Sequence, residues 1–407
     1  MLLISPVAAL DPPSGDVTYT EQLVRTPPPG VAYTTYDEAI AQGDLTELGT
    51  RESLRAASGP DLVLQAGVAL ARKLERLVRR SGLAYREPIR IFRVNPQRFD
   101  LVHVHVFHHR FLGAHPPVVA SAGGPLRWVY ADAWGWGRTR VAMAEGIDHA
   151  LGWLWGATMC AARLGRADLF ISPSEYLRTW LQERGWPSAR IAVQPNYLSL
   201  GRASEARDEA PRTIGFVARD FAAKGGMIVL EAFAALRQRH PTLRLIIVGS
   251  PARLSESEQH RTGIRWFSQV ARSQLLEEIL PSIDLLAYPS GFDTGVPYSA
   301  MEAISQGIPA VVSDYRSLPD LVGDGAGLVS RPDAASVSTA IEKLLAPATY
   351  ATASAAAAQR FHQKFSAVTQ APRLRKLYEA ALVGVSASAI PPRKRPFMRR
   401  KGTSTHR

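Results

Sequence analysis

One segment of the sequence, residues 284–314, combines an apolar strand, a loop with two glycines and a proline, a short helix and a second strand. Residues 285–289 are apolar, and residues 299–306 fit one short helix. Free backbone N–H groups at such a helix N-terminus, together with the helix dipole, favour a bound phosphate. Glu302 lies one turn into this helix, within reach of a sugar hydroxyl. The segment therefore predicts an anion site beside a carboxylate.

Two cations follow another apolar strand, in the stretch GFVARDFAAKGG. We expect the strand to end near Ala218, so that Arg219 and Lys224 flank a turn that closes on Gly225 and Gly226. Arginine binds a diphosphate bidentately and lysine acts as a point charge, so the pair suits a diphosphate. Lysine is rare here, with 7 lysines against 41 arginines, which argues against chance placement. The alternative is a solvated pair of loop cations.

Two histidines lie on the alternating stretch LVHVHV. The two-residue period of a strand directs His103 and His105 to the same face. One interpretation places one of them at a cleft, and the other makes them hydrogen-bonded core residues. His108 and His109 follow, but no cysteine or spaced carboxylate accompanies them, so the sequence predicts no metal site.

Short strands and helices must position these residues. Their alternation in the second half predicts a parallel sheet that binds ligands beyond the carboxyl ends of its strands. The first half has a similar but less regular pattern, with residues 31–82 as an excursion from it. The expected strands are residues 213–218, 243–248, 264–267, 283–288 and 310–313 in the second half, and 1–5, 101–106, 117–120 and 168–172 in the first.

The chain as a whole has the features of a two-domain globular protein. Its 407 residues exceed what one hydrophobic core usually organises. The polar stretch 199–212 lacks periodicity and predicts a linker. No segment reaches the roughly 20 apolar residues that span a bilayer, and the N-terminus lacks the basic residues of a signal peptide. A single cysteine, Cys160, excludes an intramolecular disulfide. We therefore expect a cytoplasmic protein.

The net charge of +12 is concentrated at the C-terminus. Residues 391–407 carry seven cations and no acid, and subtracting these from +12 leaves +5 for the remainder. Such a Pro-flanked tail cannot bury a core and is expected to be disordered. It predicts either a solvated extension or a peripheral contact with anionic lipid at the inner face of the membrane. No zinc-finger spacing or aromatic RNA-binding signature accompanies it, so no specific nucleic-acid partner is predicted.

Several of these motifs, in this order, resemble the retaining glycosyltransferases of family 4. The donor-binding pattern of that family, an acid, a GVP-like turn, small residues and Glu-Ala, is similar to residues 293–303. The family's Gly-Arg and Lys-Gly segment resembles residues 217–226, with Ala218 in place of the usual glycine. The turn at residues 248–250 and the loop at residues 267–272 follow the same order. The resemblance is closest over residues 213–345 and extends to residues 90–198.

The resemblance implies roles for individual residues. Arg219 and Lys224 would stabilise the departing diphosphate, Asp293 or Thr294 would contact the donor sugar, and Glu302 would bind the nucleotide ribose. We count Arg219, Lys224 and Asp293 as the catalytic candidates. The implied donor-binding residues are Gly15, Gly249, Val270, Thr294, Gly295, Val296, Pro297 and Glu302.

The sequence departs from the family pattern at two places. The first acid usually lies eight positions before the second, which is Thr294 here, whereas Asp293 lies nine before Glu302. Either a one-residue shift lets Asp293 substitute, or the carboxylate is absent. The family's His-Gly pair is replaced by Gly123 and Gly124, which are candidates for the cleft together with His103 and His105. A glycine pair supplies backbone N–H donors but no imidazole.

The resemblance also implies the architecture, an α/β protein of the GT-B type. Two Rossmann-like domains would enclose a cleft, and a C-terminal helix would cross back to the first domain. The expected boundaries are an acceptor-side domain at residues 1–198, a linker at 199–212, a donor-side domain at 213–364, the crossing helix at 365–383 and a basic disordered tail at 384–407.

The implied activity is that of a hexosyltransferase-type glycosyltransferase in polysaccharide or glycoconjugate biosynthesis. It would move a sugar from a nucleotide-diphosphate sugar to a hydroxyl acceptor, lipid-linked or a glycan, with retention and without a metal or other cofactor. Two alternatives stay open. A nucleotide-sugar epimerase can use the same architecture, and a catalytically weakened partner subunit would bind a nucleotide sugar without turnover.

Overall fold

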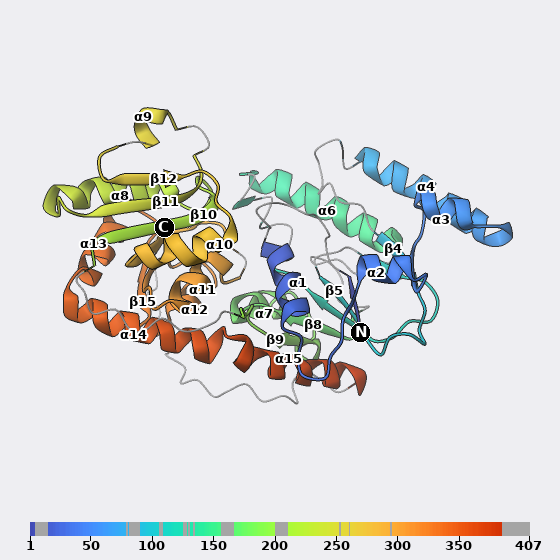
Figure 1. Ribbon diagram of the computed structural model, residues 1–407. Coiled ribbons are helices and arrows are strands. Elements are labelled where there is room, and N and C mark those ends of the chain that lie inside the picture. The colour runs from blue at the N-terminus through green and yellow to red at the C-terminus, as the bar shows by residue number, and fades with distance from the viewer. Residues whose placement is uncertain are drawn as a thin grey trace.

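The computed structural model describes residues 1–4, 15–78, 80, 90–105, 109–124, 128, 131–132, 135–155, 167–199, 211–251, 254–259, 261–293 and 295–384. It has two α/β domains that lie side by side, each built on a parallel sheet (Figure 1). Helix α14 (Pro347–Lys364) runs below the C-terminal domain, and α15 (Ala367–Leu382) continues below the N-terminal domain. The expected α/β architecture with two Rossmann-like domains is therefore confirmed.

The C-terminal domain contains a six-stranded parallel sheet in the order β12-β11-β10-β13-β14-β15. Its central strands are apolar and buried on both faces, because helices cover both sides of a parallel sheet. The strands are β10 (Thr213–Asp220), β11 (Arg244–Ser250), β12 (Ile264–Phe267), β13 (Leu285–Tyr288), β14 (Ala310–Ser313) and β15 (Gly327–Ser330). The helices are α8 (Gly226–Arg239), α9 (Glu256–Gln259), α10 (Arg272–Gln274), α11 (Tyr298–Ser305), α12 (Pro319–Val322) and α13 (Ala334–Leu344), with π- and 3₁₀-turns at Leu275–Ile279 and Leu280–Ser282.

The N-terminal domain contains a second six-stranded parallel sheet, in the order β2-β1-β5-β7-β8-β9. The strands are β1 (Leu2–Ile4), β2 (Thr34–Thr35), β5 (Val102–His105), β7 (Val118–Ser121), β8 (Leu169–Ser172) and β9 (Ile191–Val193). The helices are α1 (Gly15–Arg25), α2 (Tyr36–Ala41), α6 (Arg138–Trp155) and α7 (Glu175–Gln182), with a 3₁₀-turn at Ser188–Arg190.

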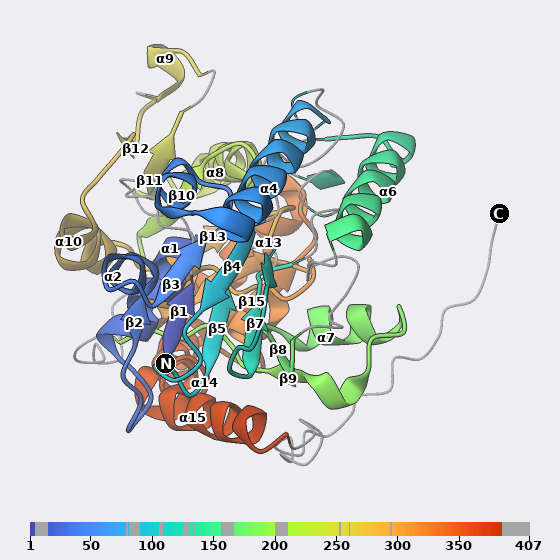
Figure 2. The same ribbon diagram turned by 90° about the vertical axis from the view of Figure 1, so that its right-hand side faces the viewer.

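The irregular first half is explained by a small additional sheet. Strand β4 (Arg90–Val94) pairs antiparallel with β3 (Leu45–Glu47) and parallel with β6 (His109–Phe111). Between β3 and β4 the chain forms α3 (Arg51–Ala56) and the long helix α4 (Gly59–Val78). Figure 2 shows α4 on the side of the N-terminal domain that carries β4. This subdomain interrupts the plain strand–helix alternation expected of a Rossmann-like domain.

The chain passes between the domains twice, and the two passages are hydrogen-bonded to each other. The Leu198 N–H donates to the Phe365 carbonyl at 2.9 Å, and the Ala367 N–H donates to the Leu198 carbonyl at 2.9 Å. Helix α15 then packs on the N-terminal sheet, where its Leu374 and Tyr378 are buried in a core shared with β1, β7 and β8. The predicted crossing of the last helix onto the first domain is confirmed.

Within the described part of the chain, every helix is too short or too polar to cross a membrane.

Candidate functional site

The switch point of the C-terminal sheet lies between β10 and β13. From β10 the chain proceeds to β11 and β12 on one side, and it then returns to β13 on the other side of β10. Loops that follow two such strands diverge above the sheet and leave a crevice, which is where open α/β sheets bind ligands. The loops after β10 and β13 carry Lys224 and Asp293. The topology therefore brings the loop that carries the cation and the loop that carries the acid together at the switch point.

The loop after β10 is held close to β13 by glycine. Strand β10 extends to Asp220 with a register shift after Val217, so the predicted end near Ala218 is wrong by two residues, and the exposed Arg219 lies within the strand. Gly225, which precedes α8, has a φ of 84°, and a Cβ there would overlap the Pro289 carbonyl oxygen. Only glycine lets this turn pack against the end of β13.

The Gly249 position at the end of β11 is restricted in the same way. A Cβ on Gly249 would overlap the carbonyl oxygen of Ala218 on the neighbouring strand. The residue therefore lies against the backbone of β10, beside the strand end that carries Arg219. Its predicted place in the donor site stays a prediction.

The side chains of Lys224 and Asp293 form an ion pair. Lys224 Nζ lies 2.7 Å from Asp293 Oδ1, contacts the Phe292 carbonyl oxygen and lies 4.7 Å from the centroid of the Phe292 ring. Burial raises the pKa of the Asp293 carboxyl, and the Lys224 ammonium opposes that rise. A buried carboxylate in this place is stabilised chiefly by one cation, so the two residues act as a unit.

Serine hydroxyls fix the loop that carries Asp293. The Phe292 N–H donates to Ser290 Oγ at 3.1 Å, and the Ser290 hydroxyl donates to the Phe292 carbonyl at 3.0 Å. The Ser313 hydroxyl donates to the Ser290 carbonyl at 2.5 Å. Thr294, the other candidate for the sugar contact, lies outside the described residues. Asp293 Oδ2 is buried, and the hydroxyls of Tyr288 and Ser290 lie close to this carboxylate.

Helix α11 begins at the same crevice. Val296 is buried, Pro297 precedes the first helical residue, and the Ser299 hydroxyl donates to the Val217 carbonyl of β10 at 2.9 Å. These contacts orient the N-terminus of α11 toward the switch point. The backbone N–H groups of the first turn are therefore available to an anion there.

Glu302 on α11 is paired with an arginine that the sequence did not single out. Arg272 Nη2 lies 2.6 Å from Glu302 Oε1. Burial raises the pKa of the Glu302 carboxyl to about 7, although the Arg272 guanidinium lowers it. Arg272 begins α10, two residues after Val270, which is half-buried against the domain core. The loop predicted to receive a base therefore lies beside the carboxylate predicted to bind a ribose.

The loop before α11 also contacts the N-terminal domain. A Cβ added to Gly295 would lie 3.3 Å from the Pro173 side chain and 3.7 Å from Asn196 Nδ2. Pro173 follows β8 and Asn196 follows β9, so the carboxyl ends of both sheets face each other here. The crevice at the switch point is thus closed on one side by the other domain.

A second contact between the domains involves an arginine in an unusual backbone conformation. Arg316, which follows β14, has a φ of 48°. Its guanidinium lies 2.5 Å from Asp132 Oδ2 and 3.8 Å from the centre of the Trp128 ring. The sequence does not predict the ion pair between Arg316 and Asp132, because the two residues are 184 positions apart.

His103 and His105 lie in a buried polar network at the carboxyl ends of β5 and β7. His103 is fully buried, with Nδ1 2.8 Å from the Tyr378 hydroxyl and Nε2 2.8 Å from Ser121 Oγ. His105 Nδ1 lies 2.7 Å from the same Ser121 oxygen, and Tyr19 stacks on the His105 ring. Burial, together with the nearby His105, lowers the pKa of His103 to about 3, so the ring is neutral. This arrangement matches the interpretation as hydrogen-bonded core histidines.

The remaining predicted site residues lie on the N-terminal side. Gly123 and Gly124 follow β7 and are half-buried, and Gly15 is the first residue of α1. No described contact links them to the Lys224–Asp293 pair, so their predicted roles stay predictions.

Comparisons with known families match both halves of the chain. The family model described as Glycosyltransferase Family 4 matches residues 43–202, and the model described as Glycosyl transferases group 1 matches residues 201–360. EpsF of Bacillus subtilis (strain 168), a candidate glycosyltransferase, is 27% identical over 158 residues, which are 35% of this chain and 40% of EpsF. WcaL of Escherichia coli (strain K12), a candidate colanic acid biosynthesis glycosyltransferase, is 28% identical over 170 residues, 39% of this chain and 42% of WcaL. The chain thus spans about two fifths of the length of these curated relatives.

Solved structures share the fold. A glycosyltransferase from Rickettsia africae superposes with a TM-score of 0.56 at 13% identity, covering 94% of this chain and 98% of that one. Sucrose-phosphate synthase from Thermosynechococcus elongatus gives 0.53 at 17% identity, covering 70% and 74%. Anabaena HepE in complex with UDP-glucose gives 0.51 at 17% identity, covering 69% and 79%.

Proposed function

This chain belongs to the family-4 glycosyltransferases of the GT-B fold, and from that premise we propose that it transfers a sugar from a nucleotide-diphosphate sugar to a hydroxyl acceptor. The observation that carries the proposal is the Lys224–Asp293 ion pair at the switch point of the C-terminal sheet, beside the Glu302–Arg272 pair. A cation at the end of β10 and a carboxylate at the end of β13 suit a diphosphate and its sugar. We further propose that transfer retains the anomeric configuration and needs no metal.

The proposed donor geometry assigns each charge a task. Lys224 and Arg219 neutralise the diphosphate that leaves, helped by the backbone N–H groups that begin α11. Asp293 holds Lys224 through Oδ1 and offers its second carboxylate oxygen, Oδ2, to a donor-sugar hydroxyl. Glu302 accepts hydrogen bonds from the ribose, and the backbone around Val270 receives the base. Uridine diphosphate sugars are the first donor class to test, because HepE shares the fold and is described with UDP-glucose.

The acceptor would enter from the N-terminal domain. Gly123 and Gly124 follow β7 and carry no side chains, so a bulky hydroxyl acceptor can approach the backbone there. WcaL is named for colanic acid biosynthesis, which supports a glycan or a lipid-linked glycan as the acceptor class.

The proposed function is tested by following donor and product together. A thermal-shift screen of nucleoside diphosphates and their sugars first identifies the donor. Labelled donor is then incubated with glycan and lipid-linked acceptors, with and without a strong chelator. We expect a labelled product with the donor's anomeric configuration and full turnover in chelator. Sugar inversion at a ring carbon with donor alone would identify an epimerase instead, and binding without any product would identify a partner subunit.

The residue that contacts the donor sugar is found by comparing Asp293→Asn with Thr294→Ala. We expect Asp293→Asn to weaken binding of the nucleotide sugar by on the order of tenfold while sparing the nucleoside diphosphate, because one charge-assisted hydrogen bond is lost. Thr294→Ala should leave both affinities unchanged. Calorimetric titration with both ligands measures the contrast, and the opposite pattern would assign the sugar contact to Thr294.

Deletion of residues 391–407 should leave folding and donor binding intact. The deletion removes seven of the positive charges, so adsorption to anionic vesicles should become weaker and less sensitive to salt. Thermal unfolding and vesicle sedimentation at two salt concentrations measure both effects. A large fall in the unfolding temperature would mean that the tail is part of the folded structure.

A further inference from the structure

Helix α4 buries its polar face and exposes its apolar one. The side chains turned toward the domain are Gln65, Val68, Arg72 and Glu75, all less than 9% exposed. A surface helix of a globular protein normally does the reverse. The outward apolar residues are Leu62, Val63, Leu64, Leu70, Leu74, Leu77 and Val78, which are 40% to 73% exposed.

Buried polar contacts fix this orientation. Arg72 donates to Glu47 Oε1 at 2.8 Å and to the Leu48 carbonyl at 2.9 Å. Gln65 Oε1 accepts from the Gly49 N–H at 2.7 Å and from the Ser53 hydroxyl at 3.0 Å. Rotating the helix to bury its leucines would take Arg72 away from the Leu48 carbonyl and Gln65 away from the Gly49 N–H, and the loss of these hydrogen bonds would destabilise the domain. The apolar face is therefore held outward by the fold.

The outward face forms a continuous stripe. Val63, Leu70, Leu74 and Leu77 recur at intervals of three, four and seven residues, which places them on one side of the helix. Their exposed fractions are 73%, 60%, 57% and 57%. A contiguous apolar stripe of this kind on a surface marks an interaction site.

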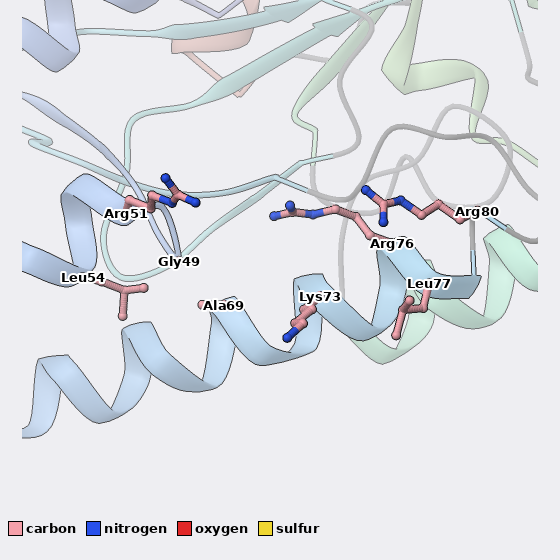
Figure 3. Close-up of a pocket in the computed structure, with 8 residues that line it drawn as sticks. All are labelled: Gly49, Arg51, Leu54, Ala69, Lys73, Arg76, Leu77 and Arg80. Atoms are coloured by element: carbon pink, nitrogen blue, oxygen red, sulfur yellow. The ribbon is translucent and has the colours of Figure 1, made fainter.

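Four cations line a pocket beside the stripe. The pocket has a volume of about 370 Å³ and lies between α3, α4 and the turn at Gly49 (Figure 3). Its wall contains apolar atoms of Leu54, Ala69 and Leu77. No acidic residue lines it, and none of the four cations forms an ion pair with a described residue. They are Arg51, Lys73, Arg76 and Arg80.

We propose that the α4 stripe and this pocket form a docking surface for an anionic lipid bilayer. An amphipathic helix with leucines on one side and flanking lysines and arginines lies in the plane of the headgroups, with its apolar side in the acyl boundary. The pocket would receive a lipid phosphate. α4 lies at the end of the N-terminal domain remote from the C-terminal domain, so docking leaves the latter free (Figure 1). The proposal does not depend on the sugar-transfer activity.

Charge complementarity favours a bilayer over a second copy of the chain. Pairing two α4 stripes would bring two sets of like charges together with no acidic partner on the pocket side. An anionic surface instead gains attraction from each cation, which is worth about a fivefold change in partitioning per residue. The apolar stripe alone would suit either a bilayer or a second copy of the chain. The four cations favour the anionic bilayer.

The test is co-flotation of the full chain with vesicles of phosphatidylcholine alone or mixed with phosphatidylglycerol. We expect binding to the mixed vesicles only. Lys73→Gln/Arg76→Gln should weaken it on the order of 30-fold, from two cations at about fivefold each. Leu70→Ser/Leu74→Ser should weaken it at least as much. These side chains are exposed, so far-UV circular dichroism and the unfolding temperature should match the wild type.

Matched controls are Val368→Ser, an exposed valine on α15, and Lys343→Gln/Lys376→Gln, which removes the same charge elsewhere. Both should bind vesicles normally, and deletion of residues 391–407 should retain the dependence on α4. Hydrogen exchange of the wild-type chain should show slower exchange in α4 when vesicles are present, whereas inorganic phosphate at equal ionic strength should not produce it. Unchanged binding by the α4 variants, or a dimer in lipid-free solution that Leu70→Ser/Leu74→Ser dissociates, would overturn the proposal.

Discussion

Lys224→Ala lowers the turnover of sugar transfer by on the order of 10²-fold or more, the loss typical of one preorganised charge that stabilises a transition state. Lys224 lies 2.7 Å from Asp293 Oδ1 at the switch point, where the diphosphate of the proposed donor would develop charge as it leaves. The effect should fall on kcat more than on KM, because the added charge appears only in the transition state. Steady-state kinetics at saturating donor measure it, with Lys343→Ala as a surface control.

Lys224→Ala also leaves the buried Asp293 carboxylate without its ion-pair partner. The resulting loss of stability must be distinguished from the loss of catalysis. Removing one partner of a buried pair costs about 3–5 kcal/mol, with the lower end expected here because Lys224 is 18% exposed. Lys224→Ala/Asp293→Asn should therefore recover most of the unfolding free energy without recovering turnover. Normal turnover in Lys224→Ala, or a double variant that regains activity together with stability, would contradict the role assigned to Lys224.

Glu302→Gln removes the pH dependence of nucleotide-sugar binding. The pKa of Glu302 is about 7, so the carboxylate that would accept ribose hydrogen bonds is ionised above pH 7 and protonated below it. If only the ionised form binds, affinity in the wild type falls about tenfold for each pH unit below the pKa. The variant should bind weakly at every pH. A nucleotide sugar is the correct ligand, because its diphosphate diester does not itself titrate in this range.

Stability has the opposite pH dependence at this residue. The folded pKa of Glu302 is raised above the unfolded value of 4.5, so its contribution to stability is fully present below 4.5 and is lost as pH rises to about 7. Glu302→Gln should therefore be more stable than the wild type above pH 7 and similar at low pH. Glu277→Gln, an exposed carboxylate nearby, is the control. Equal nucleotide-sugar affinity in Glu302→Gln and wild type at pH 8 would remove Glu302 from the ribose site.

The sequence by itself determined the elements and which residues follow them. Buried parallel strands are short apolar runs, and helices carry their own period, so β10, β13 and α11 were readable from local pattern. The sequence also predicted that ligands bind beyond the carboxyl ends of the strands, and Lys224 and Asp293 lie in the loops that follow β10 and β13 there. The misplaced end of β10 reflects a register shift that depends on its neighbour β11.

Only the tertiary structure decided which of these residues touch. The Lys224–Asp293 pair joins loops 69 residues apart, and the sequence contains nothing that links Glu302 to Arg272. His103 is a core residue because Tyr378 of α15 returns across 275 residues to bond it. The periodicity of α4 was present in the sequence, but its direction was not, since leucines normally point inward. That direction depends on contacts with distant residues: Arg72 pairs with Glu47 of β3, which also pairs with Arg90, and the polar side of the helix is therefore the buried one.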